Sequence, residues 1–264
     1  MPTVKDKVVI VTGASEGIGR ALAMQLSAAG ARLMLAARNR ERLEELANQL
    51  PGEAEVCPCD VAQPEQCQQL VHQTLAHFGR LDILINNAGI TMWSRFDDLE
   101  DLGVFERLMR VNYLGAVYLT HAALPALKHS RGSVVAVASI AGLTGVPCRS
   151  GYAASKHAMV GFFDSLRIEL KDQGVDVTLI CPDFVVSQTH KRAMGADGHP
   201  LGQTPMQESK IMTAERCAQL CLTAISRRER LLITSLRGKL GRWLRLLAPG
   251  FIDALADRAI RQRR

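Results

Sequence analysis

The sequence predicts one α/β domain in which a parallel sheet of about seven strands carries helices on both faces. Short apolar runs rich in β-branched residues alternate along the chain with longer helical patterns. Such alternation is typical of parallel sheets whose strands are joined by right-handed helical crossovers. The 264 residues suffice for one large domain, and no Pro/Ser-rich linker or internal repeat divides them.

The strands are expected wherever a short run is apolar and rich in β-formers. They are predicted at 7–12, 32–37, 54–59, 82–86, 132–139, 175–181 and 230–234. In the fifth, Val134 to Ala138 is apolar throughout, as in a strand buried on both faces. The helices are predicted at 17–29, 40–50, 64–78, 100–128, 151–172 and 213–225. The first helix begins in a glycine-rich turn, and the second follows Arg38 directly.

Several residues suited to ligand binding end or follow the predicted strands. They are Gly13, Arg38, Asp60, Asn87, Ser139 and Pro182. Ligands of open parallel sheets bind beyond the carboxyl ends of the strands. We therefore expect these residues at one edge of the sheet and in one site.

The turn from Thr12 to Gly19 has the spacing Gly-x-x-x-Gly-x-Gly between a strand and a helix. Its glycines let the backbone approach an anion, and the free N–H groups and the dipole of the helix start attract that anion. The turn predicts a phosphate site, as opposed to a glycine-rich connection without a ligand.

Tyr152 and Lys156 stand at positions i and i+4 of a predicted helix, so their side chains share one face. A lysine ammonium beside a phenol favours the phenolate and thereby assists proton transfer. Ser139, from another element, supplies a hydroxyl that can bind the oxygen gaining or losing the proton. Alone, such a Tyr-Lys pair is also found as an exposed helical pair.

Together with Asn86 to Gly89 and Asn112, these motifs have the order and spacing of a known family. The chain resembles the single-domain short-chain dehydrogenase/reductases over nearly its whole length to about residue 235. The resemblance implies a Rossmann-type three-layer fold and hydride transfer between a nicotinamide cofactor and a carbonyl or alcohol carbon. Tyr152 would exchange the proton at the oxygen, and Ser139 would position that oxygen. Lys156 would assist Tyr152 and bind the nicotinamide ribose.

The resemblance also implies that Asn112 distorts its helix and holds a water linking Lys156 to solvent. The alternative is an ordinary asparagine in a helix interior. Asparagine is a mediocre helix former, which favours a solvated or hydrogen-bonded role.

The cofactor contacts that the motifs and the resemblance imply extend along the whole expected site. They are Gly13, Ser15, Gly17, Ile18, Gly19, Arg38, Asp60, Val61, Asn87, Ala88, Gly89, Tyr152, Lys156, Pro182, Val185 and Ser187. Asp60 and Val61 would lie beside the adenine, although Asp60 is also suited to cap the helix at 64–78. Asn87 to Gly89 would follow the middle of the cofactor.

NADP(H) is the predicted cofactor, in preference to NAD(H). The second strand ends at Ala37 and Arg38 without the acidic residue that binds the ribose in NAD-selective enzymes. Arg38 can bind a 2′-phosphate with its planar fork, and Ser15 can add a hydroxyl donor. The alternative is that Arg38 is a surface arginine that opens the helix at residue 40. Glu16 lies beside this region and opposes strong phosphate binding.

The segment after the sixth strand departs from the family. Where Pro-Gly and a later Thr are usual, this chain has Pro182, Asp183 and then Ser187. Serine retains the hydroxyl, whereas Asp183 lacks the backbone freedom of glycine and brings a carboxylate near the site. Both departures bear on how the chain holds the cofactor there.

Two segments, Ile140 to Arg149 and Phe184 to Met212, are expected to border the substrate. The second would form a lid near 185–212 with a mobile hinge at Gly195 to Gly202. The candidate wall residues are Ile140, Leu143, Val146, Cys148, Phe184, Val185, Val186, Met194, Met206 and Met212, with Met92 and Trp93. An apolar lining suits a lipophilic ketone, aldehyde or secondary alcohol. Some of these residues can equally belong to the core.

Composition excludes several other classes of protein. The apolar fraction of 47% and the charged fraction of 22% are ordinary for a soluble globular protein. We find neither a secretion signal nor a run able to span a bilayer. Seven cysteines, an odd number, predict reduced thiols and a cytoplasmic setting, with no disulfide framework and no metal site.

The net charge of +6 is concentrated at the C-terminus, where residues from 227 onward hold 11 Lys/Arg and 3 Asp/Glu. A nearly neutral core argues against nucleic-acid binding. We therefore divide the chain into a catalytic domain at 1–235 and a basic amphipathic extension at 236–264. Leu244 to Gly250 resembles the end of a subgroup of lipid- and steroid-active reductases.

The extension carries apolar residues among its arginines. They are Trp243, Leu244, Leu247, Phe251, Ile252 and Leu255. They predict amphipathic helices that either lie on an anionic membrane surface or pack on the domain or on a partner subunit.

The predicted function is an NADP(H)-dependent oxidoreductase that interconverts a lipophilic ketone or aldehyde and an alcohol. The complete Ser-Tyr-Lys set favours this over a catalytically silent cofactor-binding regulator or scaffold. A homodimer or homotetramer is expected through the helices at 100–128 and 151–172. Ala158 and Gly161 in the second helix permit close approach of another helix.

Overall fold

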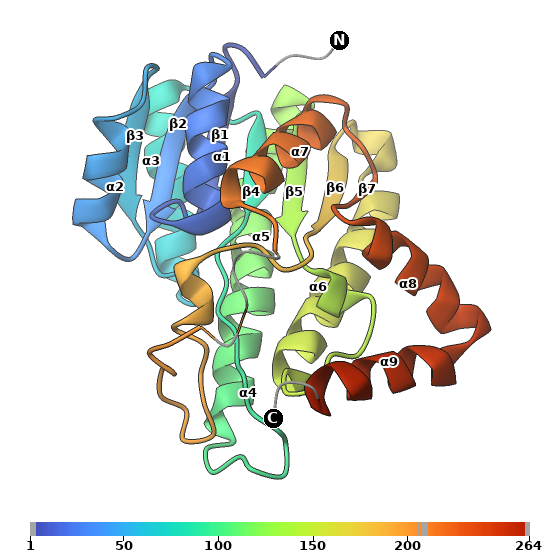
Figure 1. Cartoon of the computed structure of the whole chain (residues 1–264). Coiled ribbons are helices and arrows are strands. Elements are labelled where there is room, and N and C mark those ends of the chain that lie inside the picture. Colours follow the sequence, from blue (N-terminus) through green and yellow to red (C-terminus); the bar gives the residue numbers. More distant parts are fainter. Residues whose placement is uncertain (1–3, 205, 207–210, 262–264) are drawn as a thin grey trace.

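The computed structural model describes residues 4–204, 206 and 211–261, with the backbone only at 255 and 259–261. Within these residues, seven parallel strands form one sheet in the order β3-β2-β1-β4-β5-β6-β7 (Figure 1). The strands are β1 (Val8–Thr12), β2 (Arg32–Ala37), β3 (Ala54–Pro58), β4 (Ile83–Asn86), β5 (Ser133–Val137), β6 (Asp176–Cys181) and β7 (Leu231–Ile233). Each predicted strand is confirmed to within two residues at either end.

The strand order reverses between β1 and β4. The chain runs outward from β1 through β2 to β3, and then returns to β4 on the other side of β1. Val11 near the end of β1 lies opposite Ile85 near the end of β4. Because the crossovers leave these neighbouring strands in opposite directions, a crevice opens at their carboxyl ends.

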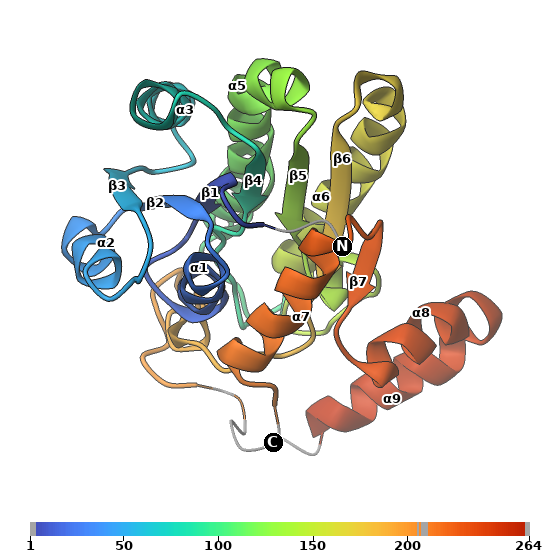
Figure 2. The same cartoon turned by 90° about the horizontal axis from the view of Figure 1, so that it is seen from above.

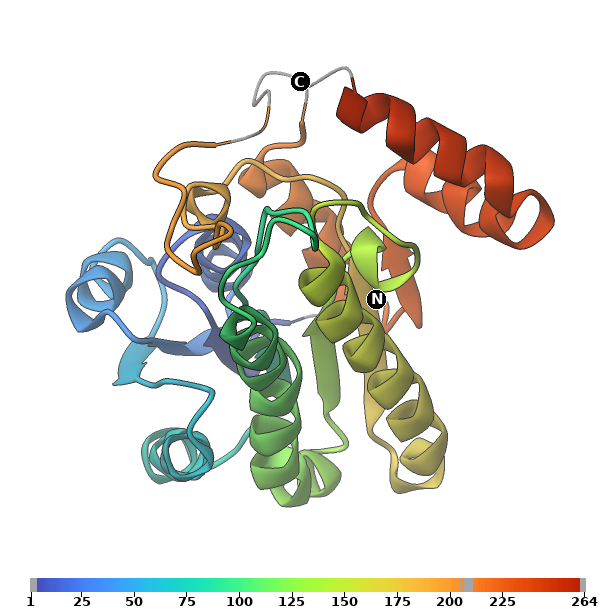
Figure 3. The same ribbon diagram turned by 90° about the horizontal axis from the view of Figure 1, so that it is seen from below.

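Helices cover both faces of the sheet, as the views from above and below show (Figures 2 and 3). One face carries α1 (Gly17–Ala28), α2 (Arg40–Ala47) and α7 (Ala214–Ser226). The other carries α3 (Pro64–Phe78), α5 (Gly115–Ser130) and α6 (Ser150–Glu169). The predicted three-layer, doubly wound architecture is confirmed.

Each face of the sheet has its own apolar core. The core under α3, α5 and α6 includes Leu70, Leu119 and Phe163. The core under α1, α2 and α7 includes Leu22, Leu43 and Cys217. All seven cysteines are free thiols, and six of them are buried. Burial of apolar side chains on both faces of the sheet is what stabilises this fold.

The helix predicted at 100–128 is divided in the structure, so that prediction was wrong in its continuity. α4 (Gly103–Leu108) passes into a π-helical turn, η1 (Met109–Leu114), before α5 begins. The helical apolar pattern runs through all three pieces and does not reveal the change. The turn contains Asn112, whose buried side chain hydrogen-bonds to groups outside the helix, and such π-turns are frequent at functional sites.

The segment predicted as a lid lies at the carboxyl edge of the sheet. It contains the short helix η4 (Gln188–His190), and single bridges join Val185 to Met212 and Met194 to Met92. In the predicted hinge, the Gly195 N–H donates to the His199 carbonyl over 2.8 Å and closes a turn. Residues 205 and 207–210 of this segment lie outside the described residues.

α8 (Leu236–Leu247) and α9 (Pro249–Arg261) form a helical hairpin that projects from the domain beyond β7 (Figures 1 and 3). Leu236, Leu240, Trp243 and Leu247 follow helical spacing along α8 and are 62–81% exposed. The alternative that the extension buries its apolar side chains on its own domain is therefore wrong for this stripe. The side chain of Leu255 and residues 262–264 lie outside the described residues.

Among the described helices, none has the length and apolar character needed to cross a membrane.

Candidate active site

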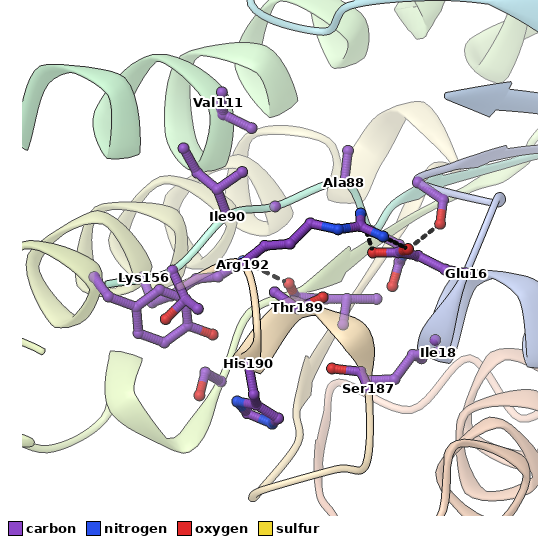
Figure 4. A pocket seen from close by; sticks show the side chains of 18 of the residues that line it. Glu16, Ile18, Ala88, Ile90, Val111, Lys156, Ser187, Thr189, His190 and Arg192 are labelled. Carbon is purple, nitrogen blue, oxygen red and sulfur yellow. Dashed lines mark hydrogen bonds and ion pairs between the residues drawn. The ribbon is translucent and has the colours of Figure 1, made fainter. Parts of the chain in front are cut away.

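A cavity of about 980 Å³ opens at the carboxyl edge of the sheet, where the strand order reverses. It reaches from the glycine-rich turn to Tyr152 and is bordered by the segment after β6. Every predicted site residue lines it except Gly19 and Asn112. Figure 4 shows part of this lining, with Lys156 at one end and Glu16 and Ile18 at the other. The structure thus brings the predicted site together from seven segments of the chain.

The glycine-rich turn leaves no room for side chains where the chain folds tightest. Gly13 has a φ of +64°, and a Cβ there would lie 2.9 Å from the Asn87 Nδ2. A Cβ on Gly19 would collide with the carbonyl oxygen of Gly13. Gly19 therefore lies behind the cavity wall and acts on the turn, and the start of α1 stays open toward the cavity.

Thr12 joins this turn to β4 through a buried hydroxyl. Its Oγ1 donates to the Ile85 carbonyl over 3.1 Å and accepts the N–H groups of Asn87 and Ala88 over 2.9 and 3.0 Å. The Asn87 amide also donates to the Thr12 carbonyl over 2.8 Å. Asn87 and Ala88, predicted as cofactor contacts, are therefore also parts of the scaffold that holds the glycine-rich turn.

Glu16 is neutralised by two arginines that were not expected at the site. Arg192, from the predicted lid, donates to both carboxylate oxygens over 2.8 and 2.5 Å (Figure 4), and Arg42 of α2 donates over 3.2 Å. The negative charge of Glu16, which was expected to oppose phosphate binding, is therefore compensated by two arginines. Arg38 lies exposed at the same rim and has no salt bridge to any described residue.

Asp60 stands at the rim after β3 and does not cap α3. Its Oδ1 accepts the Ala62 N–H over 3.0 Å, and Gln63 is the residue before the first turn of α3. The alternative role as a helix cap is therefore wrong, because the carboxylate closes a local turn over residues 60–62, before the helix begins.

Ser139, Tyr152 and Lys156 line the inner end of the cavity. Ser139 precedes a short 3₁₀ turn, and its Oγ accepts the Ala141 N–H over 3.1 Å. The Lys156 Nζ donates to the Val137 carbonyl over 3.0 Å and lies 5.9 Å from the centre of the Tyr152 ring. Burial lowers the pKa of this ammonium, and attraction to Tyr152 partly opposes that effect.

Asn112 lies behind these residues, fully buried in η1. Its Oδ1 accepts the Ile90 N–H over 2.8 Å, and its Nδ2 donates to the Ile90 carbonyl over 3.0 Å and to Ser155 Oγ over 2.9 Å. The side chain ties the loop after β4 to α6. The expected distortion of the helix is confirmed, the alternative of an ordinary helix asparagine is wrong, and the water link to Lys156 stays a prediction.

Arg149 is a residue of the site that sequence reasoning named only as the end of a segment. It is 5% exposed, lines the cavity, and its guanidinium carbon lies 4.1 Å from the centre of the Tyr152 ring. One amino group donates to Thr91 Oγ1 over 2.7 Å. Its position three residues before Tyr152 was the only available signal.

Asp183, which replaces the usual glycine, is bound by the C-terminal extension. Its carboxylate is 5% exposed and accepts hydrogen bonds from the Arg237 fork, from Ser235 Oγ over 2.6 Å and from the Phe184 N–H over 2.8 Å. Burial raises the pKa of the carboxyl, but these hydrogen bonds outweigh burial and hold it below its ordinary value. Asp183 is not among the residues with positive φ, so its backbone does not require glycine.

The apolar wall is smaller than the sequence suggested. Ile140, Val146, Phe184, Val185 and Met194 line the cavity. The other predicted wall residues lie outside its lining; they are Leu143, Cys148, Val186, Met206, Met212, Met92 and Trp93. Met92 packs in a small separate core with Val104 and Leu108, and Leu143 packs beside Ile233. For these two, the alternative of core packing is correct.

Comparison with known proteins agrees with this fold. The family model described as short chain dehydrogenase matches residues 7–196, so the chain belongs to the short-chain dehydrogenase/reductase family. It is an oxidoreductase of that family.

Relatives share more than a third of the sequence. Dehydrogenase/reductase SDR family member 7B of Bos taurus is 38% identical, over 99% of this chain and 84% of the relative. The 11-beta-hydroxysteroid dehydrogenase 1A of Arabidopsis thaliana is 38% identical, over 85% of this chain and 67% of the relative. The similarity to the first of these extends through the C-terminal extension.

Solved structures share the fold with NAD or an NADP derivative bound. A short chain dehydrogenase/reductase from Burkholderia phymatum in complex with NAD has a TM-score of 0.84 and 25% identity, covering 95% of this chain and 96% of that one. An alcohol dehydrogenase from Thermococcus sibiricus complexed with 5-hydroxy-NADP has a TM-score of 0.74 and 26% identity, covering 86% and 95%. Nicotinamide dinucleotides are thus typical cofactors of this fold.

Proposed function

We propose that this chain interconverts a lipophilic ketone or aldehyde and the corresponding alcohol with NADP(H). The observation that carries the proposal is the convergence of Ser139, Tyr152 and Lys156 on one cavity with the glycine-rich turn. A site for proton transfer and a site for an anionic cofactor are therefore continuous. A scaffold without catalysis would not need the first of these.

The residues around the turn fit a dinucleotide. Gly13 and Gly19 hold the backbone in a shape that side chains would prevent, and α1 begins at Gly17 on the cavity wall. Free N–H groups at a helix start bind phosphate oxygens. Ser187 lies beside this turn, where a Cβ on Gly17 would be 3.3 Å from the Ser187 Cβ, and Val185 lines the same cavity.

In the reducing direction, a nicotinamide cofactor held beside the glycine-rich turn would supply the hydride for the carbonyl carbon. The Tyr152 hydroxyl gives its proton to the carbonyl oxygen, so that one hydride and one proton complete the alcohol. The Ser139 hydroxyl holds that oxygen in place. The Lys156 ammonium, 5.9 Å from the Tyr152 ring, stabilises the phenolate until a proton returns from solvent.

NADP(H) is favoured by the charges at the rim. Arg38 is exposed there, and Arg42 and Arg192 surround the single carboxylate of Glu16. Three guanidinium groups against one carboxylate make a site that attracts a 2′-phosphate. Ser15 lines the same end of the cavity and can add a hydroxyl donor.

A lipophilic substrate is favoured by the wall near Tyr152. Ile140, Val146, Phe184 and Met194 present apolar side chains to the cavity. One relative is named as a hydroxysteroid dehydrogenase, which accords with a bulky apolar substrate. Apolar walls with few polar groups are typical of sites for such molecules.

We further propose a homodimer or homotetramer. On α6, Gly161 is exposed with open space around its α-carbon, and Ile168 is 73% exposed. Met159 and Phe163 are buried in the core and are not available for such a contact. The apolar stripe of α8 offers a second surface, either to a partner subunit or to an anionic membrane.

The experiment that tests the proposed function is a turnover screen of purified enzyme with NADPH and NADH on a panel of apolar ketones, aldehydes and secondary alcohols. We expect turnover of apolar carbonyl compounds with NADPH preferred. Cofactor binding without any turnover, together with a stable protein partner, would instead support a catalytically silent regulator.

A further inference from the structure

The cavity contains a buried cation that the proposed proton transfer does not use. Arg149 is 5% exposed, and its guanidinium carbon lies 4.1 Å from the centre of the Tyr152 ring, 5.5 Å from Phe184 and 5.9 Å from Trp93. Aromatic faces attract a guanidinium but accept no conventional hydrogen bond from it. The charge is therefore held mainly against aromatic rings, where the Tyr152 side chain also provides a polar contact.

The hydrogen bonds of Arg149 are incomplete. One amino group donates to Thr91 Oγ1 over 2.7 Å. Its Nε has no hydrogen-bond partner, and Arg149 is the one residue with such a buried side-chain atom in the part of the chain that the structure describes. An arginine stays charged in proteins, and a buried donor without a partner is costly.

The carboxylates that line the same cavity are already engaged. Glu16 is bound by Arg42 and Arg192, and Asp183 by Arg237. Asp60 closes its own turn at the opposite rim. Within the described ranges, Arg149 has no salt bridge to a carboxylate. No carboxylate lining the cavity is therefore available as a negative partner for this cation.

We propose that Arg149 binds an anionic oxygen group of the substrate, placed close to the carbonyl that Tyr152 protonates. This deepens the proposed function and rests on it. The substrate would be an apolar carbonyl compound that carries a carboxylate or a phosphate, since both match a guanidinium. The stacking on Tyr152 places the anion next to the reacting oxygen, and the cofactor phosphates belong at the far end, beside Gly13 and Gly17.

The test compares acids with their esters. Wild-type enzyme is given 2-oxo and 4-oxo fatty acids, their methyl esters, and a long-chain hydroxyketone with and without a phosphate ester, all with NADPH. We expect kcat/KM for at least one anion to exceed that of its neutral counterpart by about 10- to 100-fold, the range of a charge-assisted hydrogen bond. The two sources of the anion are distinguished by which compound, the carboxylic acid or the phosphate ester, has a higher kcat/KM than its neutral counterpart.

Arg149→Met should remove this preference. Turnover of the preferred anion should fall by about 10- to 100-fold, mainly through KM, while turnover of its neutral counterpart changes by only a few-fold. Arg149→Lys should restore part of the preference because it keeps the charge without the fork. Arg110→Met is the matched control: Arg110 also lines the cavity, but its side chain is 57% exposed and pairs with Glu106.

Binding is measured separately from turnover. Titration of the enzyme–NADPH complex with a hydroxy fatty acid and with its methyl ester, followed by nicotinamide fluorescence, reports affinity without catalysis. NADPH affinity and circular dichroism show whether each variant is folded. If Arg149→Met does not fold, the inference is tested by the anion preference of Arg149→Lys and by that of the wild-type enzyme.

Two results would overturn the inference. One is a wild-type enzyme that turns over neutral ketones and anionic ones equally well, which leaves the proposed function intact. The other is an equal loss for acid and ester in Arg149→Met, which would make Arg149 a residue that only positions Tyr152. If no carbonyl compound is turned over, the proposed function fails. The binding titration then still shows whether Arg149 recognises the anion.

Discussion

The contact between Asp183 and the C-terminal extension is predicted to hold α8 on the domain. Asp183→Asn keeps the shape of the side chain and removes its charge. The wild-type carboxylate accepts hydrogen bonds from Ser235 Oγ, the Phe184 N–H and the Arg237 fork. With a neutral amide, these bonds lose their charge assistance, and the Arg237 pair is lost.

The magnitude follows from how exposed each partner is. Only the bonds from Ser235 and Arg237 connect the extension to the domain, because Phe184 adjoins Asp183 in the chain. The Asp183 carboxylate is 5% exposed, so its hydrogen bond from Ser235 Oγ should weaken from about 1.5–3 kcal/mol toward the ~0.5–1.5 kcal/mol of a neutral bond. Arg237 is 66% exposed, which limits its pair to about 0–1 kcal/mol. We expect the free energy of detaching α8 to fall by about 1–2 kcal/mol, a roughly 5- to 30-fold rise in the detached population.

Limited proteolysis measures that population. Chymotrypsin is used under native conditions, and cleavage after Trp243 in α8 is followed by mass spectrometry. When opening is fast compared with cleavage, the rate tracks the open population, so Asp183→Asn should be cut about 5- to 30-fold faster. Asp172→Asn, an exposed acid in the short helix η3 (Lys171–Gln173), is the control. Equal rates for wild type and Asp183→Asn would refute the reasoning.

The same contact gives a pH dependence with a definite sign. Because the pKa of Asp183 is lower in the folded protein than its ordinary value, the carboxylate binds fewer protons folded than unfolded. Its stabilisation is complete above the ordinary pKa of an aspartate and is lost as the pH falls through the lower, folded pKa. Protection of Trp243 should therefore decline on acidification in wild type more than in Asp183→Asn.

Three further predictions test other parts of the site. Arg38→Asp should shift preference from NADPH toward NADH by about 10-fold or more, because a phosphate fork is replaced by a repelling charge; unchanged steady-state preference would mean that the phosphate is held elsewhere. Gly19→Ala should abolish NADPH binding in a fluorescence titration because its Cβ would collide with the Gly13 carbonyl, and retained affinity would contradict the tight packing of that turn. Light scattering at micromolar concentration should show a dimer or tetramer; a monomer that sediments with anionic vesicles would assign the α8 stripe to a membrane.

Much of the fold could be predicted because its signals are local. Each strand is a short apolar run, and Tyr152 and Lys156 share a helix face by spacing alone. The tight glycine-rich turn is likewise signalled within eight residues, Thr12 to Gly19. These features depend on neighbours in the sequence, which the sequence displays directly.

The parts that could not be predicted depend on distant pairs. Arg192 reaches Glu16 across 176 positions, and Arg237 reaches Asp183 across 54. Neither arginine has a local pattern that distinguishes it from a solvated charge. The π-turn at Asn112 was hidden for a similar reason, because it is held by Ile90 and Ser155, 22 and 43 positions away.

The measurement that tests the central claim most directly is the rate of NADPH oxidation with an apolar ketone by wild type and by Tyr152→Phe, together with the NADPH dissociation constant of each. The proposed mechanism predicts that wild type turns over and that Tyr152→Phe loses about 10²- to 10⁴-fold in kcat because its proton donor is gone. NADPH affinity should remain largely unchanged, since Tyr152 lies apart from the glycine-rich turn that we propose to hold the phosphates. A Tyr152→Phe variant that retains the wild-type rate would contradict the role of Tyr152 and with it the proposed mechanism.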